Sequence, residues 1–458
     1  MAARAAESRL LCQDVRSLTL RLSLPCLVSM LASGLSTLLD AIFLSRASSS
    51  LAAAAGLCFP LVTLIQTIGF TLGMGSGSFV SRELGSGGES QRARAAASTA
   101  LYAALALGGA LCLMGQLFPA GLLRLLGARE EMLVSAVFYA RFVLACAPLT
   151  CTSLVLASLL RAQGYPAPGV WAYCAGLLTG AGLCYFLMMR LSLGVIGAGI
   201  ATLVREALIL AVFSIYTLRL KGALRPVPRA VSLRLCTVRD IMRSGLPTLV
   251  RQGLMSVSGA MLSHALAQLG ESAVAGMGLA LRMVNLVSSA IIGFGQGFAP
   301  VCGANYGAGR MNRVQEAYSF CLRVLMISLA LLGAAVYIAS PFLLSRLAPD
   351  EASAAFGLAA LRAQSAVFFA QGAVILMNML TQSMGLPVRA TLIASSRQGY
   401  IFIPLLLVLP RLFGAWGIIC AQPASDLLSI LLSWALVRGF TGSSSSRCGC
   451  SGARKGSR

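Results

Sequence analysis

Long apolar runs follow one another along the chain, separated by short clusters of Gly, Pro, Arg and Ser. Most runs reach or exceed the roughly 20 residues that a helix needs to cross a bilayer. We expect helices, because in lipid every backbone polar group must be satisfied within a helix or a closed barrel. The pattern predicts an all-α polytopic membrane protein with twelve transmembrane helices, near residues 18–44, 52–82, 94–118, 132–160, 167–190, 194–219, 241–266, 273–305, 314–341, 353–384, 388–410 and 414–438.

The order of local sequences repeats about 220 residues later. R-L-S-L-P-C-L-V at 21–28 corresponds to R-S-G-L-P-T-L-V at 243–250, which places Pro25 opposite Pro247. R-A-Q-G-Y-P at 161–166 corresponds to Q-S-M-G-L-P at 382–387. Such a chain predicts two six-helix repeats around a central cavity, and an even number of helices makes the repeats parallel. Both prolines fall inside the first helix of their repeat, where we expect kinks.

Polar segments mark the boundaries of these repeats. We expect a cytoplasmic N-terminal segment at 1–17, an N-lobe of six helices at 18–219 and a cytoplasmic linker at 220–240. The C-lobe follows at 241–438, and the basic, Ser/Gly-rich tail at 439–458 is predicted to be disordered. The first 17 residues lack the short apolar core of a cleaved signal peptide, so the first span is expected to act as the targeting signal.

Composition agrees with a membrane protein and narrows its chemistry. Hydrophobic residues make up 57% of the chain and charged residues 11%, with a mean hydropathy of +0.83, whereas soluble domains are about 25% charged. The 14 cysteines are scattered, and the single histidine, His264, has no zinc-like spacing to them. We find no nucleophile elbow and no paired catalytic carboxylates. The sequence therefore predicts no enzyme and no cofactor.

The net charge of +22 sets the orientation. With both termini in the cytoplasm, 24 of the 36 Lys and Arg residues fall on cytoplasmic segments and the adjoining parts of the spans, and six fall on the outer side. This asymmetry predicts a multi-pass protein of the plasma (inner) membrane with both termini inside. The positive charge is then an orientation signal in contact with membrane lipid, and a nucleic-acid partner is excluded.

Three acids lie inside predicted spans, where a charge is costly and marks a functional candidate. Asp40 is in the first span, and its counterpart 222 residues later is Leu262. Glu206 and Asp426 are counterparts, 220 apart, which also fits a shared structural task. We treat all three as ion-coupling candidates.

Other polar side chains inside spans are candidates for a substrate cavity. For each of them, a helix-to-helix hydrogen bond or, for arginine, snorkelling to the interface is an equally good explanation. The candidates are Thr37, Gln66, Arg141, Gln252, Ser256, Arg282, Asn285, Gln296, Gln371 and Asn378.

Several motifs, in this order, resemble the multidrug and toxic compound extrusion (MATE) family, and its bacterial drug-efflux branch in particular. They are L-P in the first span followed by Asp40, V-S-R-E-L-G-S-G-G at 80–88, L-L-R-A-Q-G-Y-P at 159–166, L-G-V-I-G-A-G-I-A-T at 193–202, G-F-G-Q-G-F-A-P-V-C-G-A-N-Y-G-A-G-R at 293–310 and Q-P-A-S-D at 422–426.

The resemblance implies two six-helix lobes around a V-shaped cavity and alternating access. It implies export of small organic compounds, often cationic, in exchange for protons or sodium. Asp40 matches the aspartate to which the family's N-lobe cation site is attributed, and Thr202 is a plausible companion. The sequence departs from the family in its fifth span, which holds no acid, so the coupling ion stays open, as does the question whether Asp40 acts without a partner carboxylate.

Two alternatives remain open at this point. One is a flippase or exporter of a lipid-linked saccharide or cell-wall precursor, which intramembrane arginines suit because guanidinium groups bind phosphate. The other is a scaffold or receptor that transports nothing, which the intramembrane acids and the paired prolines disfavour. We expect a monomer in each case.

Overall fold

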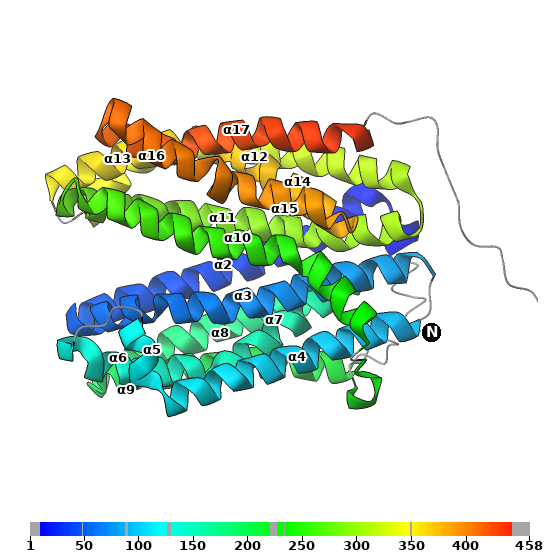
Figure 1. Ribbon diagram of the computed structural model, residues 1–458, viewed down its shortest axis with the longest axis horizontal. Coiled ribbons are helices and arrows are strands. Elements are labelled where there is room, and N and C mark those ends of the chain that lie inside the picture. The colour runs from blue at the N-terminus through cyan, green and yellow to red at the C-terminus, as the bar shows by residue number, and fades with distance from the viewer. Residues whose placement is uncertain are drawn as a thin grey trace, which may run out of the picture.

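The computed structural model describes residues 10–47, 49–87, 90–125, 130–219, 227–232, 234–348 and 350–441. Within these ranges the chain forms helices joined by short turns, arranged as two lobes that lie side by side (Figure 1). Residues 1–9 of the predicted N-terminal segment, 220–226 of the predicted linker and 442–458 of the predicted tail lie outside the described residues. The described residues therefore show the all-α, two-lobe architecture that the sequence repeat predicts.

The N-lobe consists of the helices before the linker. Its long helices match the first six predicted spans, and a short helix, α5, precedes the fourth. The bounds are α2 Val15–Ala47, α3 Ser49–Gly85, α4 Ser90–Leu117, α5 Pro119–Leu125, α6 Glu130–Ala145, α7 Ala147–Ala162, α8 Ala167–Tyr185 continued by the π-helix η1 Phe186–Arg190, and α9 Gly194–Arg219.

The C-lobe repeats this order after a 3-10 turn, η2 Pro228–Ala230, in the linker. The linker is fastened to α4, since the backbone N–H groups of Val227 and Ser232 donate to the hydroxyls of Ser98 and Thr99. The C-lobe bounds are α10 Leu235–Ala267, α11 Glu271–Gly307, α12 Met311–Leu347, α13 Glu351–Ser365, α14 Phe368–Ser383, α15 Pro387–Ser395, the π-helix η3 Ser396–Tyr400, α16 Phe402–Phe413 and α17 Ala415–Thr441.

Among the described helices, ten spans are long and apolar enough to cross a membrane, and eleven when the bent pair α13 and α14 is counted as one. The remaining predicted span is α10, whose apolar character is diluted by Arg251, Gln252, Ser256 and Ser258. A helix with this many polar residues is expected where it faces other helices or water rather than lipid.

The fourth and tenth spans are broken at equivalent places. Cys146 separates α6 from α7, just before Pro148. Its counterpart 221 residues later, Val367, lies between α13 and α14, whose axes differ by 53°. The sequence predicted one continuous helix in each case, because apolar runs do not reveal where an axis bends.

The repeated Gly-X-Pro motifs are helix ends. Gly164 and Gly385, 221 apart, have φ of 80° and 74°, which is a left-handed conformation that favours glycine. In each motif the residue after the glycine closes the helix: Tyr165 N–H donates to Leu160 and Leu386 N–H to Thr381, both at 3.0 Å. The repeat in the sequence is thus a repeat of helix caps.

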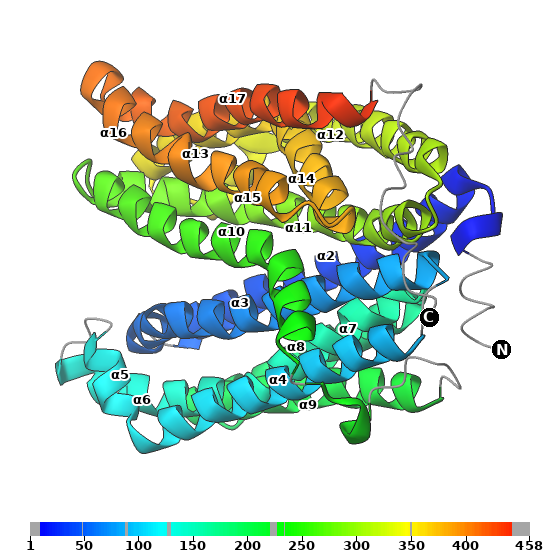
Figure 2. The same cartoon turned by 45° about the vertical axis from the view of Figure 1, so that its right-hand side comes forward.

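The lobes meet at one end of the molecule, which we call the closed end: the N-terminal part of α2 and the C-terminal parts of α3 and α11. There α2 packs on α11 and α3 on α10. Glycines allow backbone-to-backbone contact, because a Cβ on Gly245 would overlap the Thr71 carbonyl and one on Gly85 would overlap Ala304. From this end the ribbons of the two lobes diverge, and α10 bends toward the N-lobe near its N-terminal end (Figure 2).

An N-terminal strap, residues 10–14, crosses the closed end from one lobe to the other. Leu10 is 1% exposed and lies near Gly164 of the N-lobe. The C-lobe holds the strap's carbonyls: Arg310 donates to Leu11 at 2.7 Å and Arg313 to Gln13 at 2.5 Å. The strap is therefore a further contact between the lobes, besides the α2–α11, α3–α10 and α3–α11 pairs.

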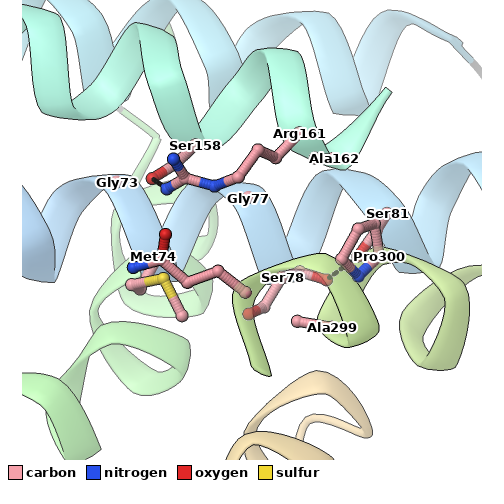
Figure 3. Close-up of a pocket in the computed structure, with 11 residues that line it drawn as sticks. Gly73, Met74, Gly77, Ser78, Ser81, Ser158, Arg161, Ala162, Ala299 and Pro300 are labelled. Atoms are coloured by element: carbon pink, nitrogen blue, oxygen red, sulfur yellow. Dashed lines mark hydrogen bonds between the residues drawn. The ribbon is translucent and has the colours of Figure 1, made fainter. Parts of the chain in front are cut away.

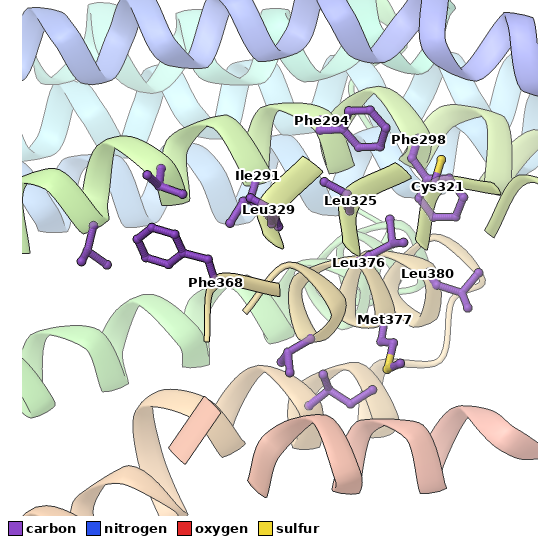
Figure 4. Packing of buried hydrophobic residues seen from close by; sticks show 14 of the residues in the cluster. Ile291, Phe294, Phe298, Cys321, Leu325, Leu329, Phe368, Leu376, Met377 and Leu380 are labelled. Carbon is purple, nitrogen blue, oxygen red and sulfur yellow. The ribbon is translucent and has the colours of Figure 1, made fainter. Parts of the chain in front are cut away.

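Side chains from α11, α12 and α14 form the centre of the largest apolar cluster (Figure 4). Phe298 and Phe368 are fully buried there, and Phe294, Leu325 and Leu376 lie among them. Close packing of this kind makes each C-lobe helix a fixed support for its polar side chains.

Candidate functional site

Five polar side chains of three helices form what we call the N-lobe charge cluster: Ser36, Asp40, Thr150, Arg205 and Glu206. The Arg205 guanidinium donates to Asp40 of α2 and, at 3.1 Å, to Ser36. Its Nε lies 3.5 Å from a carboxylate oxygen of Glu206. Thr150 of α7 donates its hydroxyl to the other Glu206 oxygen at 3.0 Å. One guanidinium thus joins two carboxylates from the first and sixth spans.

Small residues on α8 make room for this arginine. A Cβ on Gly180 would stand 2.9 Å from the Cδ of Arg205, and one on Gly176 would stand 3.4 Å from its Cγ. The arginine stem therefore runs across α8, close to its backbone, on the way from α9 to α2. This path explains how a residue on α9 reaches Asp40.

Asp40 pairs directly with Arg205, and this guanidinium links it to a second carboxylate, that of Glu206. Consecutive residues do not share a helix face, so the sequence gives no reason to pair Arg205 with Glu206. Both side chains are long enough to curl toward each other at the helix surface, and the arginine continues to α2. Thr202 lies one turn before Glu206, but its hydroxyl donates to the Ala198 carbonyl at 3.0 Å rather than to Asp40. Thr37 is also directed to its own helix, at Ser33.

A second cluster, the C-lobe charge cluster, surrounds Asp426 of α17: Gln364, Arg397, Gln422, Ser425 and Asp426. Asp426 is fully buried and accepts hydrogen bonds from Arg397 at 2.5 Å, from Gln364 at 2.7 Å and from Gln422 at 3.2 Å. Ser425 donates to the Arg397 carbonyl. Since Arg397 belongs to the π-helix η3, this cluster fixes the break between α15 and α16.

The two clusters differ in charge although Glu206 and Asp426 are counterparts. The N-lobe cluster holds two carboxylates and one guanidinium, a formal charge of −1, whereas Asp426 and Arg397 cancel. Arg251 of α10 lies within electrostatic range of Arg397 and makes no ion pair with a described carboxylate. The C-lobe side is therefore the more positive.

A small cavity lies at the closed end between α3, α7 and α11 (Figure 3). Its volume of about 30 Å³ has room for about two water molecules but not for an organic compound. Arg161 lies on its wall with the guanidinium directed to Ser158. Gln296, a predicted cavity residue, lines it with an amide oxygen that has no partner.

The other predicted cavity residues divide into three groups. Gln371 and Asn378 serve helix packing inside the C-lobe, donating to Ser288 at 2.5 Å and to the Ala390 carbonyl at 2.7 Å. Gln252 is buried and Gln66 is half-buried. Four residues are exposed and take no part in the hydrogen bonds of either charge cluster: Arg141, Ser256, Arg282 and Asn285.

Comparison with known proteins identifies the family. The MatE family model matches residues 25–186 and again residues 247–408, one match for each lobe. The chain belongs to the MatE family. The chain is therefore a multi-pass membrane transporter, and its two lobes are the two copies of the MatE unit.

Curated relatives agree along almost the full length. The multidrug export protein MepA of Staphylococcus aureus (strain NCTC 8325 / PS 47) is 25% identical over 418 residues, which cover 91% of this chain and 92% of MepA. MepA of Staphylococcus saprophyticus is 24% identical over 419 residues, covering 90% and 92%.

Solved structures show the same MatE fold. A MATE protein in complex with MaL6 superposes with a TM-score of 0.89 at 22% identity, covering 95% of this chain and 98% of that one. An outward-facing multidrug resistance MATE family transporter gives 0.87 at 23%, covering 95% and 97%. A MOP superfamily transporter from Pyrococcus furiosus, described as having a binding pocket of reverse polarity, gives 0.86 at 23%, covering 96% and 99%.

Proposed function

We propose that this MatE transporter exports organic compounds, cationic or amphipathic, in exchange for protons or sodium by alternating access. The observation that carries the proposal is the N-lobe charge cluster with its formal charge of −1, placed inside membrane-spanning helices. A buried unbalanced charge is costly, so an entering cation that balances it changes the free energy of the state that holds it. Relatives named multidrug export proteins support organic compounds as the cargo.

We further propose that the closed end faces the cytoplasm of a plasma (inner) membrane and that the protein works as a monomer. The excess of Lys and Arg on the segments at this end supports the orientation. The described conformation is then outward-facing, in keeping with the outward-facing relative that shares its fold. Asp40 lies in the half of α2 away from the closed end, where it is accessible from outside.

Efflux from vesicles tests the proposal. The protein is reconstituted into liposomes, and the liposomes are loaded with a fluorescent cation such as ethidium. A pH gradient or a sodium gradient is then imposed across the liposome membrane. We expect efflux faster than in protein-free vesicles under at least one gradient, and loss of this acceleration in Asp40→Asn. The proposal is wrong if Asp40→Asn exports as fast as the parent or if neither gradient accelerates efflux.

A second candidate is export of an anionic lipid-linked precursor. Arg251, without a described carboxylate partner, and the exposed Arg282 favour it. A transporter with the same fold is described as having a binding pocket of reverse polarity, which supports the possibility of a cargo of opposite charge on this fold. Expression in a host that lacks its own efflux pumps discriminates between the two. Resistance to cationic dyes without a change in envelope synthesis supports drug export, whereas rescue of envelope synthesis without resistance supports the precursor.

A further inference from the structure

We infer that Arg205 occupies the place of a coupling cation at Asp40, and that the coupling ion is a proton bound by Glu206. This inference rests on the proposed function and specifies its ion. It assigns to Arg205 the selection of the ion and to Glu206 its binding, whereas Asp40 becomes the fixed partner of the arginine.

Geometry gives the first step. Asp40 receives a direct hydrogen bond from Arg205, whose side chain is only 13% exposed. A guanidinium does not lose its proton at the pH of a cell, so the position beside Asp40 already holds a permanent cation. A sodium ion there would have to displace an arginine that Ser36, Gly176 and Gly180 hold in place.

The count of charges gives the second step. Two carboxylates share one guanidinium, so the cluster lacks one positive charge. Of the two acids, Glu206 is held less tightly: it lies 3.5 Å from Nε of Arg205 and otherwise accepts a neutral hydroxyl from Thr150. One proton on Glu206 converts the carboxylate to a neutral acid, changes the cluster from −1 to 0, and leaves Arg205 paired with Asp40 alone.

The ligand set gives the third step. A hard cation such as sodium needs several oxygen ligands at once, and the cluster's oxygens already accept from Arg205 and Thr150. A proton needs one oxygen. The other titratable side chains in electrostatic range are phenols and thiols, uncharged in their ordinary forms near neutral pH: Tyr139 of α6, Cys146 between α6 and α7, and Tyr173 and Cys184 of α8.

The consequence for transport follows from this balance. With Glu206 ionised, the cluster carries its extra negative charge and attracts Arg205 from two directions. With Glu206 protonated, the arginine is drawn toward α2 only. Binding of a proton therefore changes the link between α2 and α9, and an ion shifts a conformational equilibrium through such differential affinity.

Ethidium transport in proteoliposomes tests the inference, with the pH gradient and the sodium gradient imposed separately. For the parent we expect acceleration by the pH gradient and none by sodium; one pH unit can sustain up to about a tenfold concentration ratio of dye for each proton exchanged. Glu206→Gln, which keeps the size and an acceptor for Thr150, should lose the pH-driven acceleration. Glu271→Gln, a substitution of an exposed acid in the first turn of α11, should keep it.

Arg205→Gln supplies the complementary variant, since it removes the resident cation and leaves two unbalanced carboxylates. We expect its melting temperature in detergent to rise with sodium, while that of the parent does not. Parent transport driven equally by sodium, or pH-driven transport retained in Glu206→Gln, would overturn the inference, as would a sodium-dependent rise in the parent.

A spectroscopic measurement decides the matter if the variants fold poorly or if the parent transports no dye. Infrared difference spectra of the purified parent between alkaline and acidic buffer should show the carbonyl band of one protonated acid. The band should be absent in Glu206→Gln and present in Glu271→Gln. Absence of the band in the parent contradicts the inference, whereas absence of dye transport with the band present contradicts only the proposed export.

Discussion

At the residue scale, Gly180 is important because it has a hydrogen atom where other residues have a side chain. Its missing side chain leaves the space through which Arg205 crosses α8, so ion pairing between α2 and α9 depends on the helix that lies between them. Sequence reasoning named both acids of the cluster but not the arginine that joins them. The reason is physical: helix periodicity assigns faces to short side chains, whereas an arginine reaches several ångströms beyond its own face.

Gly180→Val should break the link between Asp40 and Arg205, because the added methyl groups fall where the arginine stem runs. We expect gradient-driven efflux to drop at least as far as in Asp40→Asn, with dye binding retained. Gly182→Val on the same helix is the control, since a Cβ there meets nothing within 4 Å. Equal loss in both variants would show that α8 simply tolerates no valine.

Asp426 and Arg397 form the buried pair on which the C-lobe depends. Asp426→Ala leaves the arginine without its partner, and removal of one member of such a pair costs about 3–5 kcal/mol. We expect a clearly lower melting temperature in detergent. The double variant with leucine at 397 and 426 should recover most of the loss, because replacing both charges is often nearly neutral. A double variant as unstable as Asp426→Ala would contradict this account.

Twelve spans could be predicted at the scale of elements, because each apolar run has the length of a bilayer and polar clusters separate the runs. The breaks that divide the fourth and tenth spans could not be predicted. The break at Cys146 and its counterpart at Val367 lie inside apolar runs, where hydropathy is uniform. The π-helix η3 depends on Arg397 and Asp426, which are far apart in sequence. Hydrophobic pattern thus gives the position of a helix in lipid, and tertiary hydrogen bonds give its bends.

Arg82 joins the end of α3 to the end of α14 across the lobes. It donates to the carbonyls of Ser383 at 3.1 Å and Gln382 at 3.3 Å, and to the Ser244 hydroxyl at 2.9 Å. A cation at the C-terminal end of a helix is favourable for its dipole. This helix end therefore contributes to the affinity of one lobe for the other.

Arg82→Met should weaken the closed end by about 1.5–3 kcal/mol, the range for hydrogen bonds to charged groups. Spin labels on the exposed residues Gln91 and Asn312, at the starts of α4 and α12, report the separation of the lobes in a cysteine-free background. We expect a longer-distance population in Arg82→Met. Arg92→Met, at an exposed position of α4, should leave the distribution unchanged.

The whole molecule is two rigid lobes with their contacts gathered at one end. An apolar cluster fills each lobe, and the C-lobe cluster also includes Leu18 and Leu22 of α2. The lobes contact each other through this α2 face, glycine-lined helix crossings, Arg82 and the N-terminal strap. The equilibrium between conformations is therefore governed by the contacts that only one of them contains.

Removal of the hydrogen bonds that the C-lobe donates to the strap should favour separation of the lobes at the closed end. In the double variant Arg310→Ala and Arg313→Ala, the Leu11 and Gln13 carbonyls lose their donors. A cysteine placed at Leu10, which is 1% exposed, should be protected from a maleimide in the parent background and reactive in the double variant. Arg346→Ala at the opposite end of α12 is the control, and equal reactivity in all three would show that the strap does not hold the lobes.

The glycine-lined crossings of α3, α10 and α11 also bear on the idle transporter. A barrier made of backbone against backbone contains few side chains that can swing aside, and the cavity beside it has room for only about two waters. We expect such a barrier to conduct no continuous file of water, so that ions do not leak down their gradient while no cargo is bound. The smallest residues of the chain thus keep the membrane insulating between transport cycles.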